Sequence, residues 1–113
     1  MKAPITIRRG TVAAAFIDLQ EEHRKDRRYL VEGYGDILSN VQRLQAAARA
    51  NGVPLHHWAY IVDLDTQDRP FHPLDEAGKS AFSDKDDPLI AICREVAPRD
   101  GEAMRVKAEA SAL

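Results

Sequence analysis

The stretch Thr11-Val12-Ala13-Ala14-Ala15-Phe16-Ile17 is a near-continuous run of small and apolar residues, and it stops at Asp18. Such a run is typical of a strand buried on both faces, as the strands of parallel sheets are. Alanine has a low intrinsic preference for strands, so burial must supply the stability. The run therefore predicts a parallel sheet whose first strand covers residues 11–17.

A helix is predicted next, between Asp36 and Asn51. Asp36 can cap its start, and Asn51-Gly52 with Pro54 just beyond marks its end. Apolar residues recur at helical spacing between these limits and indicate one buried stripe, made of Ile37, Val41, Leu44 and Ala48.

The stretch from Val53 to Val62 is rich in β-branched and aromatic residues and predicts a second strand. The segment from Asp63 to Asp86 follows, with prolines, aspartates and glycine but no clear period. So long a connection is more often a functional rim or lid than a simple link.

Asp87-Pro88 combines a capping residue with a proline in the first turn and predicts a second helix, which ends at Pro98. Its apolar face would consist of Leu89, Ile92, Cys93 and Val96. A third strand is predicted from Glu102 to Lys107. The order strand, helix, strand, helix, strand favours an α/β fold with right-handed crossovers and helices packed on a parallel sheet. The 113 residues show no repeat or linker, which indicates a single domain, 1–113.

Composition excludes several classes of partner. The formal charge of -2, from 16 basic and 18 acidic residues, gives no reason to expect nucleic acid or an anionic membrane as a partner. The basic cluster at residues 24–28 is interrupted by an acid, and we interpret it as a solvated loop or helix face. A single cysteine, the absence of a membrane-length apolar run and an N-terminus unlike a secretory signal lead us to expect a cytoplasmic protein.

Asp18 and Lys107 each end a predicted strand, and ligands of open parallel sheets collect at the carboxyl ends of strands. If the first and third strands are neighbours, the two side chains could face one cleft. A carboxylate there can act as a general base, and an ammonium can stabilise charge that develops in a reaction. Strand-end aspartates also cap turns and strand-end lysines are also solvated, so position alone leaves both interpretations open.

Three segments together resemble the isochorismatase-like cysteine hydrolases. Ala15-Phe16-Ile17-Asp18-Leu19-Gln20 is similar to the opening strand of that family, and Asn51-Gly52-Val53-Pro54-Leu55 to its helix exit into the second strand. Val106-Lys107 with Ser111-Ala112 matches the lysine that is followed by serine and alanine, although Leu113 stands where phenylalanine is usual. The resemblance implies a doubly wound parallel sheet with flanking helices, a Rossmann-like three-layer fold, and it leaves open whether that fold is complete here.

The resemblance also implies an active site of aspartate, lysine and cysteine. By carry-over, Asp18 would take the proton of the cysteine and Lys107 would stabilise charged states, while the thiolate attacks a small amide, ureide, carbamoyl or isochorismate-like substrate. In the family that cysteine lies well after the lysine, and this sequence ends at Leu113 before reaching it. Cys93 precedes Lys107 and belongs to the apolar face of the predicted helix, so we expect it to be a core residue.

Three explanations fit the missing cysteine: a truncated or processed fragment, one chain of a split enzyme, or a degenerate homologue that binds a partner without catalysis. Half of a doubly wound sheet would leave an open strand edge and an uncovered apolar face. We therefore expect a small-molecule substrate and, as protein partner, a second copy or a complementary chain. The alternative function is a non-catalytic partner-binding module.

No cofactor or metal is expected. Adjacent strand residues His56 and His57 should point to opposite faces, so they cannot share an ion. His72 is interpreted as a loop residue near the cleft and His23 as exposed. No glycine-rich loop follows the first strand, which disfavours nucleotide binding. Aromatic residues of the second strand, Trp58 and Tyr60, are expected in the core, whereas Phe71 and Phe82 could line either a pocket or an interface.

Overall fold

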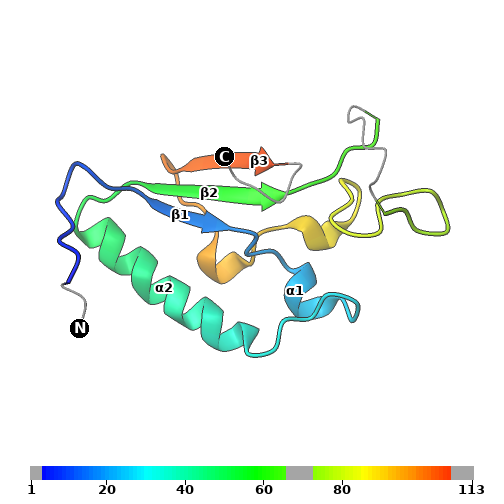
Figure 1. Ribbon diagram of the computed structural model, residues 1–113, viewed down its shortest axis with the longest axis horizontal. Helices are drawn as coiled ribbons and strands as arrows, with labels where there is room; N and C mark the ends of the chain where they lie inside the picture. The colour runs from blue at the N-terminus through cyan, green and yellow to red at the C-terminus, as the bar shows by residue number, and fades with distance from the viewer. Residues whose placement is uncertain (1–3, 66–72, 108–113) are drawn as a thin grey trace.

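The computed structural model describes residues 4–65 and 73–107 of the chain. Its centre is a parallel sheet in the order β1-β2-β3, formed by Ala14–Ile17, Leu55–Tyr60 and Ala103–Lys107 (Figure 1). The α/β fold with a parallel sheet is thus confirmed. Each strand is shorter than its predicted range. The first and third strands, whose adjacency was the condition for a cleft shared by Asp18 and Lys107, are not neighbours, since β2 lies between them.

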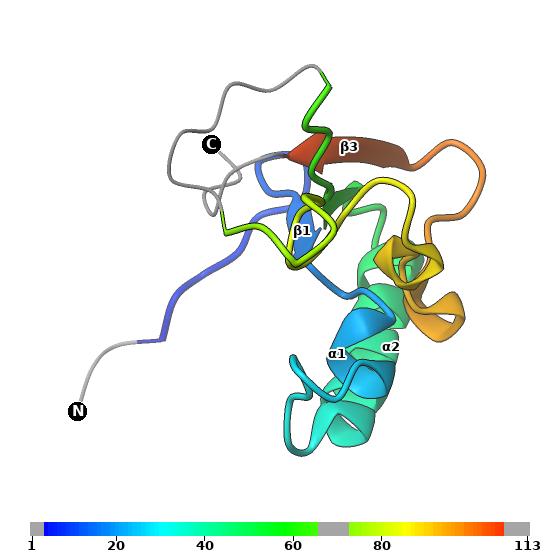
Figure 2. The same cartoon turned by 90° about the vertical axis from the view of Figure 1, so that its right-hand side faces the viewer.

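Helix α2, Tyr34–Ala50, packs against one face of the sheet, and the described helices all lie on that side when the molecule is viewed along the strands (Figure 2). It begins earlier than predicted, after Gly33, whose φ of 74° is left-handed and easy for glycine. It ends at Asn51-Gly52 as predicted, with the N–H of Val53 donating to the Ala48 carbonyl at 2.9 Å. A second helix layer is not among the described elements.

The buried stripe of α2 differs from the predicted one. Ile37 and Leu44 are 40% and 58% exposed, and the buried positions are Tyr34, Leu38, Gln45 and Ala48. Gln45 can be buried because its amide donates to the Val96 carbonyl at 3.0 Å. A satisfied polar residue therefore holds a place that hydrophobic spacing assigned to the neighbouring leucine.

The second predicted helix is wrong. Asp87 does accept a hydrogen bond from the N–H of Leu89 at 2.8 Å, but only two short 3₁₀ helices form, η1 at Pro88–Ile90 and η2 at Arg94–Val96. Between them the backbone pairs with the segment after β1 instead: the N–H of Glu21 donates to Ala91, and that of Cys93 to Leu19, both at 2.8 Å. These bonds interrupt the i to i−4 pattern that a continuous helix needs.

The sheet is covered unequally. Ile17 is 40% exposed, so the expectation that the first strand is buried on both faces is wrong for the described residues. Trp58 and Tyr60, expected in the core, are half-buried on the face away from α2, where the Arg105 guanidinium lies 5.6 Å from the Trp58 ring. Val106, on the edge strand, is 59% exposed.

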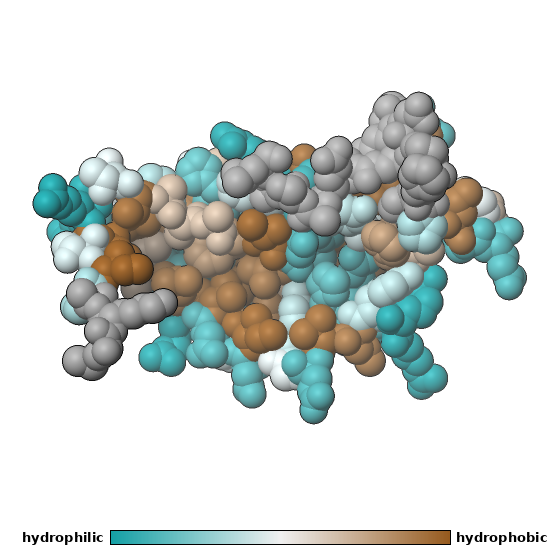
Figure 3. Space-filling model, viewed as in Figure 1, coloured by the Kyte–Doolittle hydropathy of each residue, from teal (hydrophilic) through white to brown (hydrophobic). Residues whose placement is uncertain are grey.

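Apolar side chains also gather over α2 and the segment that leads into β1 (Figure 3). Ile7 and Leu44 line a groove there together with Val12 and Val53, and the first two are 69% and 58% exposed. Among the described residues no further strand pairs with the outer edges of β1 and β3, and apolar surface is exposed, as expected from half of a doubly wound sheet. Within residues 4–65 and 73–107, no helix has the length and apolar character needed to span a bilayer.

A partly buried ion pair joins α2 to the start of β3. Arg49 donates to both carboxylate oxygens of Glu102, at 2.7 and 2.9 Å, and Nε2 of the buried His57 lies 3.1 Å from Glu102 Oε1. The Arg49 guanidinium is the main cause that lowers the pKa of Glu102 to about 2. A carboxyl group whose pKa is lowered by folding stabilises the folded state fully at pH values above its pKa in the unfolded chain, which is near 4.5. This stabilisation is lost as the pH falls towards 2.

Glu102→Gln is therefore expected to lower the free energy of unfolding by roughly 1–3 kcal/mol at pH 7 and by much less near pH 2. The amide cannot form the charge-assisted pair with Arg49. Urea unfolding at several pH values measures the difference, with Glu32→Gln, an exposed site, as control. A deficit that stays constant between pH 7 and pH 2 would show that the ion pair does not stabilise the fold.

Candidate active site

Asp18 is the first residue after β1. Its N–H still donates to the Trp58 carbonyl at 3.1 Å, as in a parallel ladder, but its φ of 61° is left-handed. In a regular strand Asp18 would share the α2 side with Phe16, because side chains alternate. The left-handed turn instead brings its carboxylate to the opposite face, the face of Tyr60.

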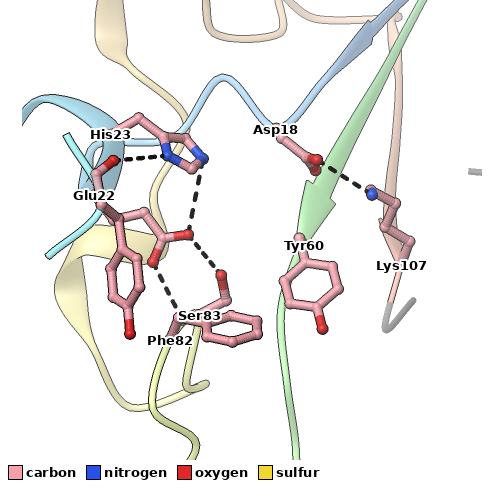
Figure 4. A pocket seen from close by; sticks show the side chains of 8 residues that line it. Asp18, Glu22, His23, Tyr60, Phe82, Ser83 and Lys107 are labelled. Carbon is pink, nitrogen blue, oxygen red and sulfur yellow. Dashed lines mark hydrogen bonds and ion pairs between the residues drawn. The ribbon is translucent and has the colours of Figure 1, made fainter. Parts of the chain in front are cut away.

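Lys107 closes β3 on that same face, since it pairs with Tyr60 in the sheet register. Its Nζ lies 3.2 Å from Asp18 Oδ2 and 5.2 Å from the centroid of the Tyr60 ring. The two side chains therefore meet across the end of β2, although their strands are not neighbours (Figure 4). The lysine side chain is only 6% exposed, whereas that of Asp18 is 40% exposed, so the pair lies at the boundary between protein and solvent.

The two carboxylate oxygens of Asp18 differ in their hydrogen bonding, since only Oδ2 contacts Lys107. Asp18 Oδ1 is buried and has no hydrogen-bond partner in the part of the chain that the structure describes. Most buried polar atoms have a partner, and exceptions are associated with catalytic roles or missing ligands. Asp18 thus combines one oxygen bound to an ammonium with one unsatisfied acceptor.

A cavity of about 400 Å³ lies beside the pair, and its wall includes Asp18, Glu22, His23, Tyr29, Tyr60, Phe82, Ser83 and Lys107. Three aromatic rings form much of this wall: Phe82 stacks on Tyr60 at 5.8 Å and meets Tyr29 edge-on at 5.8 Å. Phe82 therefore lines the pocket, one of the two roles left open for it. The long segment after β2 does form part of a cavity rim, through Phe82 and Ser83.

The opposite wall of the cavity was missed at the sequence level. Helix α1, Glu22–Lys25, supplies Glu22, which is buried and accepts hydrogen bonds from Ser83, at 3.1 Å from its N–H and 2.6 Å from its hydroxyl (Figure 4). His23 was expected to be exposed, but its side chain is only 26% exposed and lines the cavity, with Nε2 4.0 Å from Glu22 Oε1. The available signal was the short distance in sequence from Asp18.

Three of the four basic residues of the cluster near this wall, Arg24, Lys25 and Arg28, pair with local acids. Arg24 pairs with Glu21 and Glu95, and Arg28 with Asp26. The hydrogen bond from Arg24 is the main cause that lowers the pKa of Glu21 to about 2. The cluster therefore offers little free positive charge for a phosphate.

The histidine prediction for β2 is confirmed. His57 is buried on the α2 side against the Phe16 ring, whereas His56 contacts the Trp58 ring on the other face. No group of three candidate metal ligands occurs among the residues described. Lys85 binds both Asp63 and Asp65. Outside the described residues lie Phe71, His72, Ser111, Ala112 and Leu113.

Cys93 is a core residue, as predicted. Its exposed fraction is 0%, and it packs in a cluster with Tyr34, Leu38 and Val96. Burial raises the pKa of the Cys93 thiol, which disfavours the thiolate. Cys93 is also absent from the residues that line the cavity. A thiol that acts with Asp18 must therefore be another one.

Comparison with known proteins identifies the family of the chain. The model of the isochorismatase domain matches residues 12–113. The chain belongs to the isochorismatase family. No curated protein matches the sequence of this family member.

Solved structures of isochorismatase-family proteins share the fold. One from Chromobacterium violaceum is 25% identical with a TM-score of 0.64, and the alignment covers 95% of this chain and 48% of that one. An isochorismatase from Pseudomonas putida is 21% identical, with a TM-score of 0.63 and coverage of 85% and 41%. A family protein from Desulfovibrio vulgaris is 22% identical, with a TM-score of 0.61 and coverage of 87% and 53%. This isochorismatase-family chain thus spans about half the length of these relatives.

Proposed function

We propose that the chain supplies the aspartate and lysine of a hydrolase site that acts on a small amide, ureide, carbamoyl or isochorismate-like substrate with the help of a cysteine. The observation that carries the proposal is the 3.2 Å contact between Asp18 and Lys107 on the wall of a cavity. The unsatisfied oxygen of Asp18 adds an acceptor for a proton. Membership of the isochorismatase family gives independent support.

For an amide substrate the chemistry divides into two steps. Asp18 takes the thiol proton, the thiolate attacks the carbonyl carbon, and the C–N bond breaks as Asp18 returns the proton to the departing nitrogen. Asp18 then takes a proton from water, the hydroxide oxygen attacks the thioester, and the C–S bond breaks, after which the thiolate regains the proton. The Lys107 ammonium stabilises the negative charges that appear in both steps.

The cysteine of this proposal is contributed by polypeptide outside the given sequence. Cys93 is the single cysteine of the sequence, and its side chain is buried in the core beneath α2. Either a contiguous segment or a separate chain could bring the thiol to the cavity. Both sources predict the same dependence of hydrolysis on Asp18 and Lys107.

The second candidate function, a partner-binding module without catalysis, is favoured by the uncovered sheet. Ile17, on the face away from α2, is 40% exposed, although strands of a parallel sheet are ordinarily covered. Met104 and Val106, on the α2 side of the edge strand β3, are 44% and 59% exposed. A protein partner that covers either surface would remove apolar surface from water. Partner binding without catalysis would account for the exposed apolar residues of the sheet, but it would not account for the unsatisfied Asp18 oxygen.

An assay of the protein expressed from its own genomic region, with any contiguous or companion segment included, separates the two functions. The hydrolase proposal expects release of ammonia from a panel of primary amides, ureides and carbamoyl compounds, and loss of that release after treatment with iodoacetamide. Native mass measured in parallel shows whether a partner is present. A stable monomer of the 113-residue chain with no thiol-dependent hydrolysis in any sample would contradict the enzyme assignment.

A further inference from the structure

The hydrogen-bond ladder between β1 and β2 is interrupted where the candidate site begins. In the regular parallel pattern, the N–H of Tyr60 would donate to the carbonyl of Asp18, and the carbonyl of Tyr60 would accept from the N–H of Gln20. The left-handed turn at Asp18 withdraws the chain from the sheet at this point. The N–H and the carbonyl of Tyr60, which both face β1, therefore need other hydrogen-bond partners.

The side chain of Gln20 supplies these partners. Its Oε1 accepts from the N–H of Tyr60 at 2.7 Å, and its Nε2 donates to the carbonyl of Tyr60 at 3.0 Å. A carboxamide presents one acceptor and two donor hydrogens, so it can replace a peptide group and still make one further bond. That further bond runs from Nε2 to the Ile90 carbonyl at 2.7 Å.

Gln20 is fully buried, with an exposed fraction of 0%, so water cannot substitute for these bonds. Its own backbone is held as well, because Gln20 forms an antiparallel bridge with Ile92 and its carbonyl accepts from the Tyr34 hydroxyl at 3.3 Å. One residue thus connects the turn after β1, the end of β2 and the η1 region.

Tyr60 connects this arrangement to the candidate site. Its ring lies under Lys107 Nζ, stacks on Phe82 and forms part of the cavity wall. On its other edge, β2 is held by β3 through the bond from the N–H of Ile61 to the Lys107 carbonyl at 3.0 Å. The end of β2 is therefore fixed from both sides, by β3 on one and by the Gln20 side chain on the other.

We infer that Gln20 is a positioning residue, whose carboxamide replaces the peptide group that the turn at Asp18 withdraws from the sheet and thereby keeps Asp18 aligned with Lys107. A regular ladder would direct the Asp18 side chain towards α2, and a turn without a replacement would leave the end of β2 unpaired. The inference concerns the geometry of the pair, and its meaning for catalysis rests on the proposed function.

Two substitutions test the inference. Gln20→Met keeps the length of the side chain and removes all three bonds, while Gln20→Glu keeps the acceptor and sets carboxylate oxygens against the carbonyls of Tyr60 and Ile90. The matched control is Gln45→Met. Gln45 is also buried, at 1% exposed, and donates to a backbone carbonyl, but that carbonyl belongs to Val96, which is not part of the cavity wall.

Nuclear magnetic resonance of the chain supplies the readouts. In Gln20→Met the amide hydrogen of Tyr60 should exchange at least about tenfold faster than in the unchanged chain. In both Gln20 variants the nuclear Overhauser contact between the Asp18 β-hydrogens and the Lys107 ε-hydrogens should be lost. Gln45→Met should keep the contact. In the unchanged chain, the Gln20 side-chain hydrogens should be protected from exchange, a test that needs no variant to fold.

Persistence of the contact between Asp18 and Lys107 in both Gln20 variants would overturn the inference, as would rapid exchange of the Gln20 side-chain hydrogens in the unchanged chain. In the cysteine-bearing enzyme, a fall in kcat of about tenfold or more with KM within about twofold supports it. Loss of the contact with unchanged thiol-dependent hydrolysis also supports the positioning role, but refutes the catalytic role proposed for the pair.

Discussion

Asp18→Asn is expected to reduce kcat of the cysteine-bearing enzyme by roughly 10²–10⁴-fold, the range that general base catalysis contributes. The asparagine side chain has the same shape, and its carbonyl oxygen can still accept from Lys107 Nζ, which lies 3.2 Å from the Asp18 carboxylate. It cannot take a proton from a thiol. The substitution therefore removes the base and leaves the contact with lysine.

The measurement is the rate of ammonia release under saturating substrate, together with the rate at which iodoacetamide alkylates the nucleophilic thiol. Both should fall, because less thiolate is present. Asp36→Asn, in the first turn of α2 and outside the cavity, is the control and should leave both rates unchanged. Turnover that survives Asp18→Asn would remove Asp18 from the mechanism.

Lys107→Met is the second substitution with a large expected effect. Methionine follows the same path as the lysine stem, but it brings no positive charge to the Asp18 carboxylate or to the oxygen of the reacting carbonyl. We expect kcat to fall by roughly 10²–10³-fold, comparable to the loss of one donor to a developing oxyanion. The native lysine side chain is only 6% exposed, so water does not simply take the place of its ammonium group.

Lys79→Met provides the matched control, since Lys79 is exposed, pairs with Asp86 at 3.8 Å and lies outside the cavity wall. The unfolding free energy of each variant should be measured beside its kinetics, because loss of the ion pair also affects the fold. A Lys107→Met enzyme with wild-type kcat would restrict this lysine to a structural role.

The sequence predicts that Asp18 and Lys107 lie at one edge of the sheet, but a shared cleft was expected only if the first and third strands were neighbours. Both residues end predicted strands, and the ends of parallel strands meet at one edge of the sheet. The strand order was not predictable from these positions, and β2 lies between the other two strands. The pair forms nevertheless, because the left-handed turn at Asp18 moves its carboxylate across the end of β2.

The predictions that were wrong or shifted concern elements that depend on polar contacts between segments far apart in the sequence. Hydrophobic periodicity carries no information about such contacts. Gln45 occupies a buried position of α2 because of the Val96 carbonyl, 51 residues away in sequence. The predicted helix after Asp87 is replaced by 3₁₀ turns because residues 91 and 93 pair with Glu21 and Leu19. Glu22 joined the cavity wall through Ser83, again a contact between segments far apart in the sequence.

A double-mutant cycle in the cysteine-bearing enzyme tests most directly whether Asp18 and Lys107 act as one unit on the thiol. Residues that act together give strongly non-additive losses of turnover. We predict that kcat of the Asp18→Asn, Lys107→Met double variant is within about threefold of the worse single variant. A double variant whose loss equals the product of the two single losses would contradict the account.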